Sequence, residues 1–249
     1  MKHVEFLGVP GSGTTTLAAE LARVSASTTT LDDAVLASIR FGGDDQLTRV
    51  AARLSRSGTS AVWRKAFARS TDRFSALNRF LTVSPETLEA VLGAQRARIS
   101  RDQSQGRSLG WILNLMAAFQ LAGEHLGEGE VLMIDEGFAQ RSIALCGFGF
   151  SADDRPLLDR YLRSMPQPDA VIIVDTPLEV CESRLDSRGW SERVAGMDVG
   201  ERRRFLDHTA AVVKTVTAYL EGTTTELVRV DGTAPTPTTA GPLAANLLQ

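Results

Sequence analysis

Short apolar runs recur along the chain and alternate with segments of helical periodicity. Residues 3–8, 130–134 and 170–174 are nearly continuous apolar runs, and each leads into a glycine or an acidic residue. Such runs are typical of parallel strands that are covered on both faces. Weaker strand patterns lie at 28–31 and 226–230. The pattern therefore predicts a sheet of five parallel strands.

Apolar positions three or four residues apart predict helices between these strands. This spacing follows residue 14 and recurs over 199–220, where Gly222 is expected to end the helix. Ser84 and Pro85 have the residue types that begin a helix. Strands and helices that alternate without hairpin signals predict an α/β fold with three layers built around a parallel sheet.

The segment after the fourth predicted strand carries signals for its own helix. Thr176 and Glu179 have the spacing of a capping box, in which each side chain binds a backbone N–H near the other residue. Gly189 is expected to end that helix. After the last strand, the Pro- and Thr-rich residues 233–242 predict a loop, followed by a short C-terminal helix.

Glycine or aspartate stands at four of the predicted strand ends, at Gly8, Asp135, Asp175 and Asp231. In open α/β sheets, ligands bind beyond the carboxyl ends of the strands. We therefore expect the chemistry of this protein to gather at that edge of the sheet.

Residues 8–15 match the phosphate-binding pattern G-x-x-x-x-G-K-[ST] at every fixed position except one, where Thr14 stands in place of lysine. Successive backbone N–H groups of such a loop surround an anion, and glycines permit both the dihedral angles and the close approach. The dipole of the following helix adds to the attraction. The hydroxyl of Thr15 is expected to bind Mg²⁺. The residues expected to contact the nucleotide phosphates are Gly8, Gly11, Ser12, Gly13, Thr14, Thr15 and Thr16.

The missing lysine bears on catalysis, because the loss of one preorganised donor costs on the order of a hundredfold to a thousandfold in rate. Three explanations stay open. An arginine takes over the role of the lysine, or the protein binds nucleotide without efficient turnover, or the sequence carries an inactivating change at Thr14.

Acidic and amide side chains follow the third predicted strand. Asp135 is at the position where P-loop proteins keep the carboxylate that orders Mg²⁺ through water, although a helix cap or a solvated acid would look the same. Glu136 is a candidate general base. Gln140 and Arg141 are candidate substrate contacts.

Three arginines follow the fourth predicted strand, at Arg184, Arg188 and Arg193. The first two are four residues apart on the predicted helix, and the third lies beyond Gly189. Arginine suits phosphate binding because its planar guanidinium grips two oxygens at once and is always charged. These side chains are therefore candidates to close over a bound triphosphate.

Composition narrows the class of protein. A hydrophobic content of 43% predicts a globular chain, and the two cysteines and three scattered histidines have neither a disulfide nor a metal pattern. The N-terminus lacks the features of a secretory signal, and the apolar stretch 109–123 is too short to span a bilayer and indicates a buried helix. We expect a cytoplasmic protein without membrane insertion.

Charge is unevenly distributed. Residues 36–110 contain 13 basic and 6 acidic side chains, a charge of +7, so the net charge of −3 leaves −10 for the remainder. A polyanionic substrate and solvated arginine-rich helices both explain this excess. The aromatic residues of the same segment fit helix cores and base stacking, and we favour the core interpretation. They are Phe41, Trp63, Phe67, Phe74 and Phe80.

Three segments together resemble the nucleoside and nucleotide kinase branch of the P-loop proteins, including thymidylate-kinase-like and adenylylsulfate-kinase-like members. They are GVPGSGTTT at 8–16, VLMIDEGFAQR at 131–141 and VDTPLEVCESRLDSRG at 174–189. The resemblance covers the first 35 residues and roughly 130–233, in the order of the family, and leaves the helical middle unmatched.

The resemblance implies a single domain over residues 1–249 with a three-layer P-loop fold. It also implies a lid at 184–204. The unmatched residues 36–125 are expected to form a mostly helical, arginine-rich insertion for the acceptor. ATP and Mg²⁺ are the implied cofactors, so a nucleoside triphosphate is the expected partner. A small-molecule acceptor is favoured over a nucleic acid, and a homodimer stays open.

Individual roles follow from the same resemblance. Arg184 or Arg188 would contact the donor nucleotide, and Arg193 would act from the lid. Asp32 corresponds to the acceptor-side acid after the second strand. The loop of Asp231, Gly232 and Thr233 would lie near the base. The candidate catalytic residues are Asp32, Glu136, Arg141, Arg188 and Arg193.

The predicted function is ATP-dependent phosphoryl transfer to a nucleoside, a nucleotide or another small hydroxyl acceptor. A sulfotransferase is the main alternative, because residues 10–15 are similar to the P-[KR]-S-G-T-T loop of that family. Against it, Gly11 stands where that loop is basic, and Asp175 stands where an arginine is usual. A kinase of nucleic acid and a nucleotide-binding regulator of low turnover are further alternatives.

Overall fold

A computed structural model of the chain describes residues 1–25, 27–55, 61–99, 105–146 and 149–247. Within these ranges a single parallel sheet has the strand order β2-β3-β1-β4-β5. Its strands are β1 (Lys2–Leu7), β2 (Thr28–Thr30), β3 (Val131–Ile134), β4 (Ala170–Asp175) and β5 (Glu226–Asp231). The predicted five-stranded parallel sheet is confirmed.

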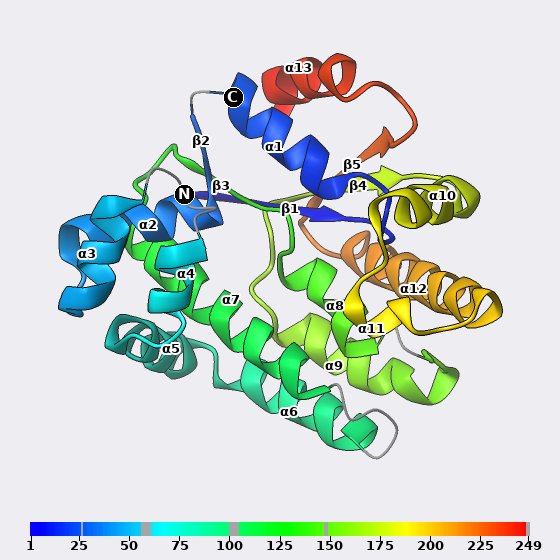
Figure 1. Ribbon diagram of the computed structural model, residues 1–249, viewed down its shortest axis with the longest axis horizontal. Helices are drawn as coiled ribbons and strands as arrows, with labels where there is room; N and C mark the ends of the chain where they lie inside the picture. Colours follow the sequence, from blue (N-terminus) through cyan, green and yellow to red (C-terminus); the bar gives the residue numbers. More distant parts are fainter. Residues whose placement is uncertain (26, 56–60, 100–104, 147–148, 248–249) are drawn as a thin grey trace.

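Helices connect the strands and cover both faces of the sheet (Figure 1). The α-helices before β3 are α1 (Thr14–Val24), α2 (Leu31–Gly42), α3 (Gln46–Leu54), α4 (Ala61–Phe67), α5 (Thr71–Val83), α6 (Pro85–Ile99) and α7 (Gln105–His125). Those after β3 are α8 (Phe138–Cys146), α9 (Arg155–Ser164), α10 (Leu178–Arg188), α11 (Glu192–Ala195), α12 (Val199–Leu220) and α13 (Thr236–Leu247), with a short 3₁₀ helix, η1 (Ala152–Asp154).

Alternate residues of β1 point into two separate cores. Val4 and Phe6 pack with α1 and α13 on one face of the sheet, whereas Leu7 packs with α7, α8, α9 and α12 on the other. Figure 1 shows α1 and α13 on one side of the strands and the larger helical layer on the opposite side. Because strand residues alternate between faces, β1 is covered on both sides and forms the centre of a three-layer fold.

Most predicted helix boundaries agree with the structure. α6 begins at Pro85 after Ser84, and α10 ends at Gly189, whose φ of 93° suits glycine. α12 spans the predicted 199–220 and begins with a capping box between Asp198 and Glu201.

The capping box predicted at the start of α10 is wrong. No described side chain caps this helix, and the hydroxyl of Thr176 instead donates to the carbonyl of Ser12 at 3.0 Å. Glu179 binds Arg203 of α12 at 2.8 Å, and this hydrogen bond lowers the pKa of its carboxyl. Tertiary partners therefore replace the local ones that the sequence offered.

The loop predicted over residues 233–242 is also wrong in part, because α13 already begins at Thr236. Backbone N–H groups in the first turn of a helix have no helical partner, so a proline there costs no hydrogen bond. Pro237 is in the first turn of α13 and is compatible with a helix start, whereas Pro242 lies inside the helix.

The segment between β2 and β3 consists of α2 to α7, and much of it packs against the sheet. α7 buries Ile112 and Met116 as expected for the apolar stretch 109–123. The core interpretation of the aromatic residues is confirmed for Trp63, Phe67 and Phe80. It is wrong for the other two, because Phe41 is 83% and Phe74 is 55% exposed on helix faces that no described helix covers.

Within the part of the chain that is described, no helix combines the length and the apolar character that a membrane span requires.

Candidate functional site

The loop between β1 and α1 has the backbone that its glycines predicted. Gly11 and Gly13 have φ angles of 90° and 106°, in the left-handed region that favours glycine. A Cβ on Gly11 would also lie only 2.6 Å from the carbonyl oxygen of Cys181, so α10 packs directly against the loop. The glycines in the sequence therefore determine this turn, and the contact with α10 leaves no room for a side chain at residue 11.

Ser12 is the most enclosed polar side chain of the loop. It is 1% exposed, and its Oγ has no hydrogen-bond partner among the described residues. Buried hydroxyls are nearly always hydrogen-bonded in folded proteins. A hydroxyl without a partner, beside Gly11 and Gly13, is therefore well suited to a phosphate oxygen.

Arg184 binds the loop of residues 8–13, which we call the phosphate loop after its sequence pattern. Its guanidinium donates to the carbonyl oxygens of Gly11 at 3.3 Å, Ser12 at 3.1 Å and Gly232 at 2.9 Å. It thereby joins the loop after β1 to the loop after β5. Three of its donors are used in this way, so its main role is to bring these two loops together.

The loop after β5 is ordered by its own carboxylate. Asp231 accepts hydrogen bonds from the hydroxyl of Thr233 at 2.6 Å and from its backbone N–H at 2.8 Å. These bonds lower the pKa of the Asp231 carboxyl. A Cβ on Gly232 would lie 2.7 Å from the carbonyl oxygen of Ser12, so glycine is needed for this close approach.

A cavity of about 480 Å³ opens between these two loops and α10. Its walls include Ser12 and Gly13 from the phosphate loop, Thr16 from α1, and Asp231 and Gly232 from the loop after β5. Several residues predicted to contact the nucleotide are in these walls, so the name given to this cavity follows from that prediction. We call it the nucleotide cavity.

The acidic residues after β3 lie next to the phosphate loop because β3 pairs with β1, with Ile134 opposite Glu5. Asp135 is half-buried at the strand end. Glu136 is ion-paired with Arg141 at 2.8 Å, and the Arg141 guanidinium lies over the ring of Trp111, 5.7 Å from its centre. These contacts fix the orientation of the Arg141 side chain.

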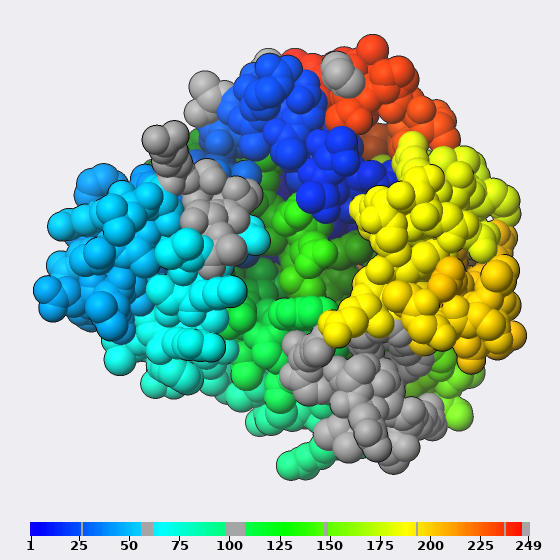
Figure 2. All heavy atoms as spheres, viewed as in Figure 1, coloured from blue at the N-terminus to red at the C-terminus, as the bar shows by residue number. Residues whose placement is uncertain are grey.

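A second cavity of about 600 Å³ touches the phosphate loop at Pro10 and shares Arg188 with the nucleotide cavity. Glu136, Gln140 and Arg141 form one wall, and Trp111 of α7 and Trp190 after α10 contribute aromatic rings. In Figure 2 the dark-blue loop after β1, the green segment around α8 and the yellow segment from α10 to α11 face one another on one side of the molecule. We call this the acceptor cavity.

Arg188 lines both the nucleotide cavity and the acceptor cavity. It is exposed, and no described residue forms an ion pair or hydrogen bond with it. Of the two arginines on α10, Arg184 is thus engaged by backbone carbonyls and Arg188 is available to a ligand.

Other predicted residues lie elsewhere. Asp32 is in the first turn of α2, forms an ion pair with Arg64 of α4 and lines neither cavity. Thr14 and Thr15 begin α1, and Thr15 is exposed. The backbone of Arg193 is in α11, but its side chain lies outside the described part of the structure.

Sequence reasoning missed Trp111 and Trp190. Each is one aromatic residue in a helical or connecting segment, and nothing in the local pattern distinguishes it from a core residue. It also missed the fully buried Glu5, whose position inside an apolar strand was the available signal.

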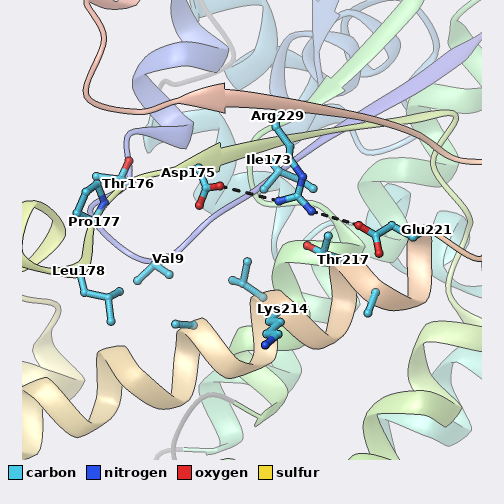
Figure 3. Close-up of a pocket in the computed structure, with 13 residues that line it drawn as sticks. Val9, Ile173, Asp175, Thr176, Pro177, Leu178, Lys214, Thr217, Glu221 and Arg229 are labelled. Carbon is cyan, nitrogen blue, oxygen red and sulfur yellow. Dashed lines mark hydrogen bonds and ion pairs between the residues drawn. The ribbon is translucent and has the colours of Figure 1, made fainter.

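A third cavity, of about 680 Å³, lies between the end of β4 and α12 and shares none of the described lining residues of the other two. Figure 3 shows Arg229 between Asp175 and Glu221, with Lys214 on α12. Because two carboxylates already neutralise Arg229, this groove is poorly suited to a triphosphate. Asp175, expected near the chemistry, lies here.

No cluster of three or more metal-ligating side chains occurs among the described residues. Mg²⁺ in nucleotide sites is usually held by one or two protein groups together with phosphate oxygens. Thr15, in the first turn of α1, and Asp135, directly after β3, are the residues predicted for that arrangement.

The five-stranded parallel sheet and the glycine-rich loop after β1 define an α/β fold of the P-loop type. No protein-family model matches the chain, and no curated protein matches it. Among solved structures, thymidylate kinase from Candida albicans is similar over 99% of this chain and 92% of that one, with a TM-score of 0.50 and 14% identity. Deoxyadenosine kinase from M. mycoides with bound dATP aligns over 99% and 100%, with a TM-score of 0.49 and 12% identity. At this level of identity, the likeness to the thymidylate kinase shows a shared fold.

Proposed function

We propose that this protein is a Mg²⁺- and ATP-dependent phosphotransferase that acts on a small hydroxyl compound, with nucleosides and nucleotides the first candidates. The observation that carries the proposal is a pair of cavities that both have phosphate-loop residues in their walls, with Arg188 in the wall of each. Phosphoryl transfer needs a donor and an acceptor in line across the transferred group. Two cavities that meet at a phosphate loop provide that arrangement.

The phosphate loop fits a nucleotide by its own chemistry. The buried Ser12 hydroxyl lacks a partner among the described residues, and Gly11 and Gly13 have the positive φ angles with which such loops surround an anion. Gly13 and Thr16 would hold the phosphates, and Thr15 and Asp135 would hold Mg²⁺. When bound, Mg²⁺ neutralises charge on the phosphate oxygens.

Glu136 and Arg141 are the residues proposed to act on the acceptor. Glu136 would take the proton from the acceptor hydroxyl as its oxygen bonds to the γ-phosphorus and the nucleoside diphosphate leaves. The carboxylate is 57% exposed and faces the acceptor cavity, whereas Arg141 is 18% exposed and holds it in place. Trp111 offers a half-exposed ring for stacking.

Arg188 takes the role that lysine has in other phosphate loops. It is the arginine of α10 that is free of described partners, and it lies between the donor and the acceptor. A guanidinium there would stabilise the charge on the transferred group. Arg193 is proposed as a second cation from the lid at 184–204, and the 36–125 insertion is proposed to serve the acceptor. Asp32, which precedes this insertion and is paired with Arg64, lines neither cavity and is given no part in the transfer.

The experiment is a transfer assay with MgATP and a panel of nucleosides, nucleoside monophosphates and other alcohols, in which nucleoside diphosphate formation is measured. We expect acceptor-dependent formation of ADP.

Tight binding of 3′-phosphoadenosine 5′-phosphate without ATP binding would support a sulfotransferase instead. ATP binding without transfer to any acceptor, with activity restored by Thr14→Lys, would support a regulator. Nucleic acid binding that weakens steeply with salt would support a polynucleotide acceptor. The homodimer is still a prediction, and light scattering would test it by measuring the molar mass in solution.

A further inference from the structure

Glu5 is a fully buried carboxylate in the middle of β1, on the face covered by α8. It lines neither the nucleotide cavity nor the acceptor cavity. A carboxylate in the interior is strongly unfavourable unless hydrogen bonds and charges compensate for the loss of water. Its presence at the centre of the sheet therefore requires an explanation.

The compensation comes from the first turn of α8. Glu5 Oε1 accepts from the backbone N–H of Phe138 at 2.8 Å, and Oε2 accepts from that of Ala139 at 2.7 Å. N–H groups in the first turn have no partner within the helix, and the helix dipole favours a negative charge there. His3 Nε2 lies 2.9 Å from the same carboxylate. The carboxylate of Glu5 thus caps α8 from inside the sheet.

Gly137 makes this approach possible. A Cβ at residue 137 would overlap the carboxyl group of Glu5. Gly137 also follows Glu136 directly, so the residue that contacts Glu5 is adjacent to the proposed general base. The position of Glu136 is therefore tied to β1 through its neighbour.

The same turn of α8 also carries Gln140, which exchanges two hydrogen bonds with Gly8, each at 3.0 Å. The first turn of α8 is thus hydrogen-bonded both to β1, at Glu5, and to the loop that follows β1, at Gly8. We propose that Glu5 is a positioning residue, which fixes the first turn of α8 so that Gln140 holds the phosphate loop and Glu136 faces the acceptor. The catalytic part of this inference rests on the proposed function.

The first test needs no ligand. Hydrogen exchange is compared between the wild-type protein and Glu5→Gln. In this variant an NH₂ group replaces one carboxylate oxygen, so a side-chain donor faces a backbone N–H donor of α8 and one hydrogen bond is lost. We expect exchange at Ala139 and at Gly8 to rise by about tenfold, with β5 unchanged. Glu130→Gln is the matched control, because Glu130 accepts a backbone N–H of Gly127 at 2.7 Å far from the loop.

Two results would overturn the inference. Faster exchange at Ala139 alone, with Gly8 unchanged, would mean that Glu5 caps α8 without holding the loop. A uniform rise that includes β5 would mean a general loss of stability. If Glu5→Gln does not fold, Gly137→Ala tests the same contact from the other side, because its Cβ pushes against the carboxylate.

The second test uses MgATP and the acceptor found in the transfer assay. We expect Glu5→Gln to weaken MgATP binding and to lower kcat by about tenfold each, while Glu130→Gln changes neither. Unchanged values in a folded Glu5→Gln would overturn the catalytic part. If the wild-type protein fails to bind MgATP, the proposed function is wrong, but the exchange experiment still decides whether Glu5 positions Gly8.

Discussion

Gln140 and Gly8 are joined through both halves of the Gln140 side-chain amide. Nε2 donates to the Gly8 carbonyl and Oε1 accepts from the Gly8 N–H, each over 3.0 Å. The two residues are 132 positions apart in the chain. The first peptide group of the phosphate loop is thereby held by α8 before any ligand arrives, which reduces the conformational cost of binding an anion.

Replacing Gln140 by Ala should weaken MgATP binding. Two neutral hydrogen bonds are lost, each of which contributes about 0.5–1.5 kcal/mol, so we expect the Kd to rise by about tenfold. Isothermal titration calorimetry measures the change. Gln120→Ala is the control, because Gln120 binds Glu124 on the exposed side of α7. An unchanged Kd in Gln140→Ala would show that the loop is organised without this contact.

Replacing Arg188 by Ala should lower turnover by about a hundredfold, because a preorganised cation at the transferred group is lost. Thr14→Lys in that background should recover part of the rate, since it restores the usual loop lysine. Initial-rate kinetics with saturating MgATP measure both effects, and Arg160→Ala, which removes an exposed partner of Glu89, is the control. If Arg188→Ala is fully active, Arg188 does not replace the missing loop lysine, and another group must do so.

The two glycines of the phosphate loop should differ in their tolerance of Ala. Both have positive φ angles, so Ala at either costs about 1–2 kcal/mol of strain. A Cβ on Gly11 also meets the Cys181 carbonyl at 2.6 Å, whereas one on Gly13 has only Arg184 Nη1 nearby, at 3.7 Å. Urea unfolding should therefore show a larger loss of stability for Gly11→Ala than for Gly13→Ala. Equal losses would contradict the packing of α10 on the loop.

Ionised Asp231 should stabilise the fold in a pH-dependent way. Hydrogen bonds from the Thr233 hydroxyl and N–H hold its pKa below the value in the unfolded chain, about 3.9. A group with a lowered folded-state pKa stabilises the protein above its unfolded pKa, and this contribution is lost as the pH falls through the folded one. The stability difference between wild type and Asp231→Asn should therefore be present at neutral pH and shrink below about pH 4.

The same arrangement can be tested at the titrating group. Thr233→Ala removes the hydroxyl donor, so the pKa of Asp231 should rise towards its ordinary value, as followed by NMR of the carboxyl carbon. A pKa that does not move in this variant would assign the shift to the backbone N–H alone.

The sequence alone determined the features that depend on neighbouring residues. Gly11 and Gly13 predicted the turn of the phosphate loop because only glycine enters the left-handed region without strain. The apolar runs located the strands, and their parallel arrangement placed Gly8 and Asp135 at one edge of the sheet.

Only the tertiary structure decided which side chains meet. Arg184 and Arg188 look equivalent in the sequence, yet Arg184 binds three carbonyl oxygens and Arg188 lines both cavities. Thr176 had a local partner at residue 179, but it binds Ser12. Glu5 accepts hydrogen bonds from the N-terminal turn of α8, more than a hundred residues away in the chain. A polar side chain often has several possible hydrogen-bond partners of similar strength. The packing of distant elements decides which partner it binds, because that packing brings one partner within reach and shields the bond from water.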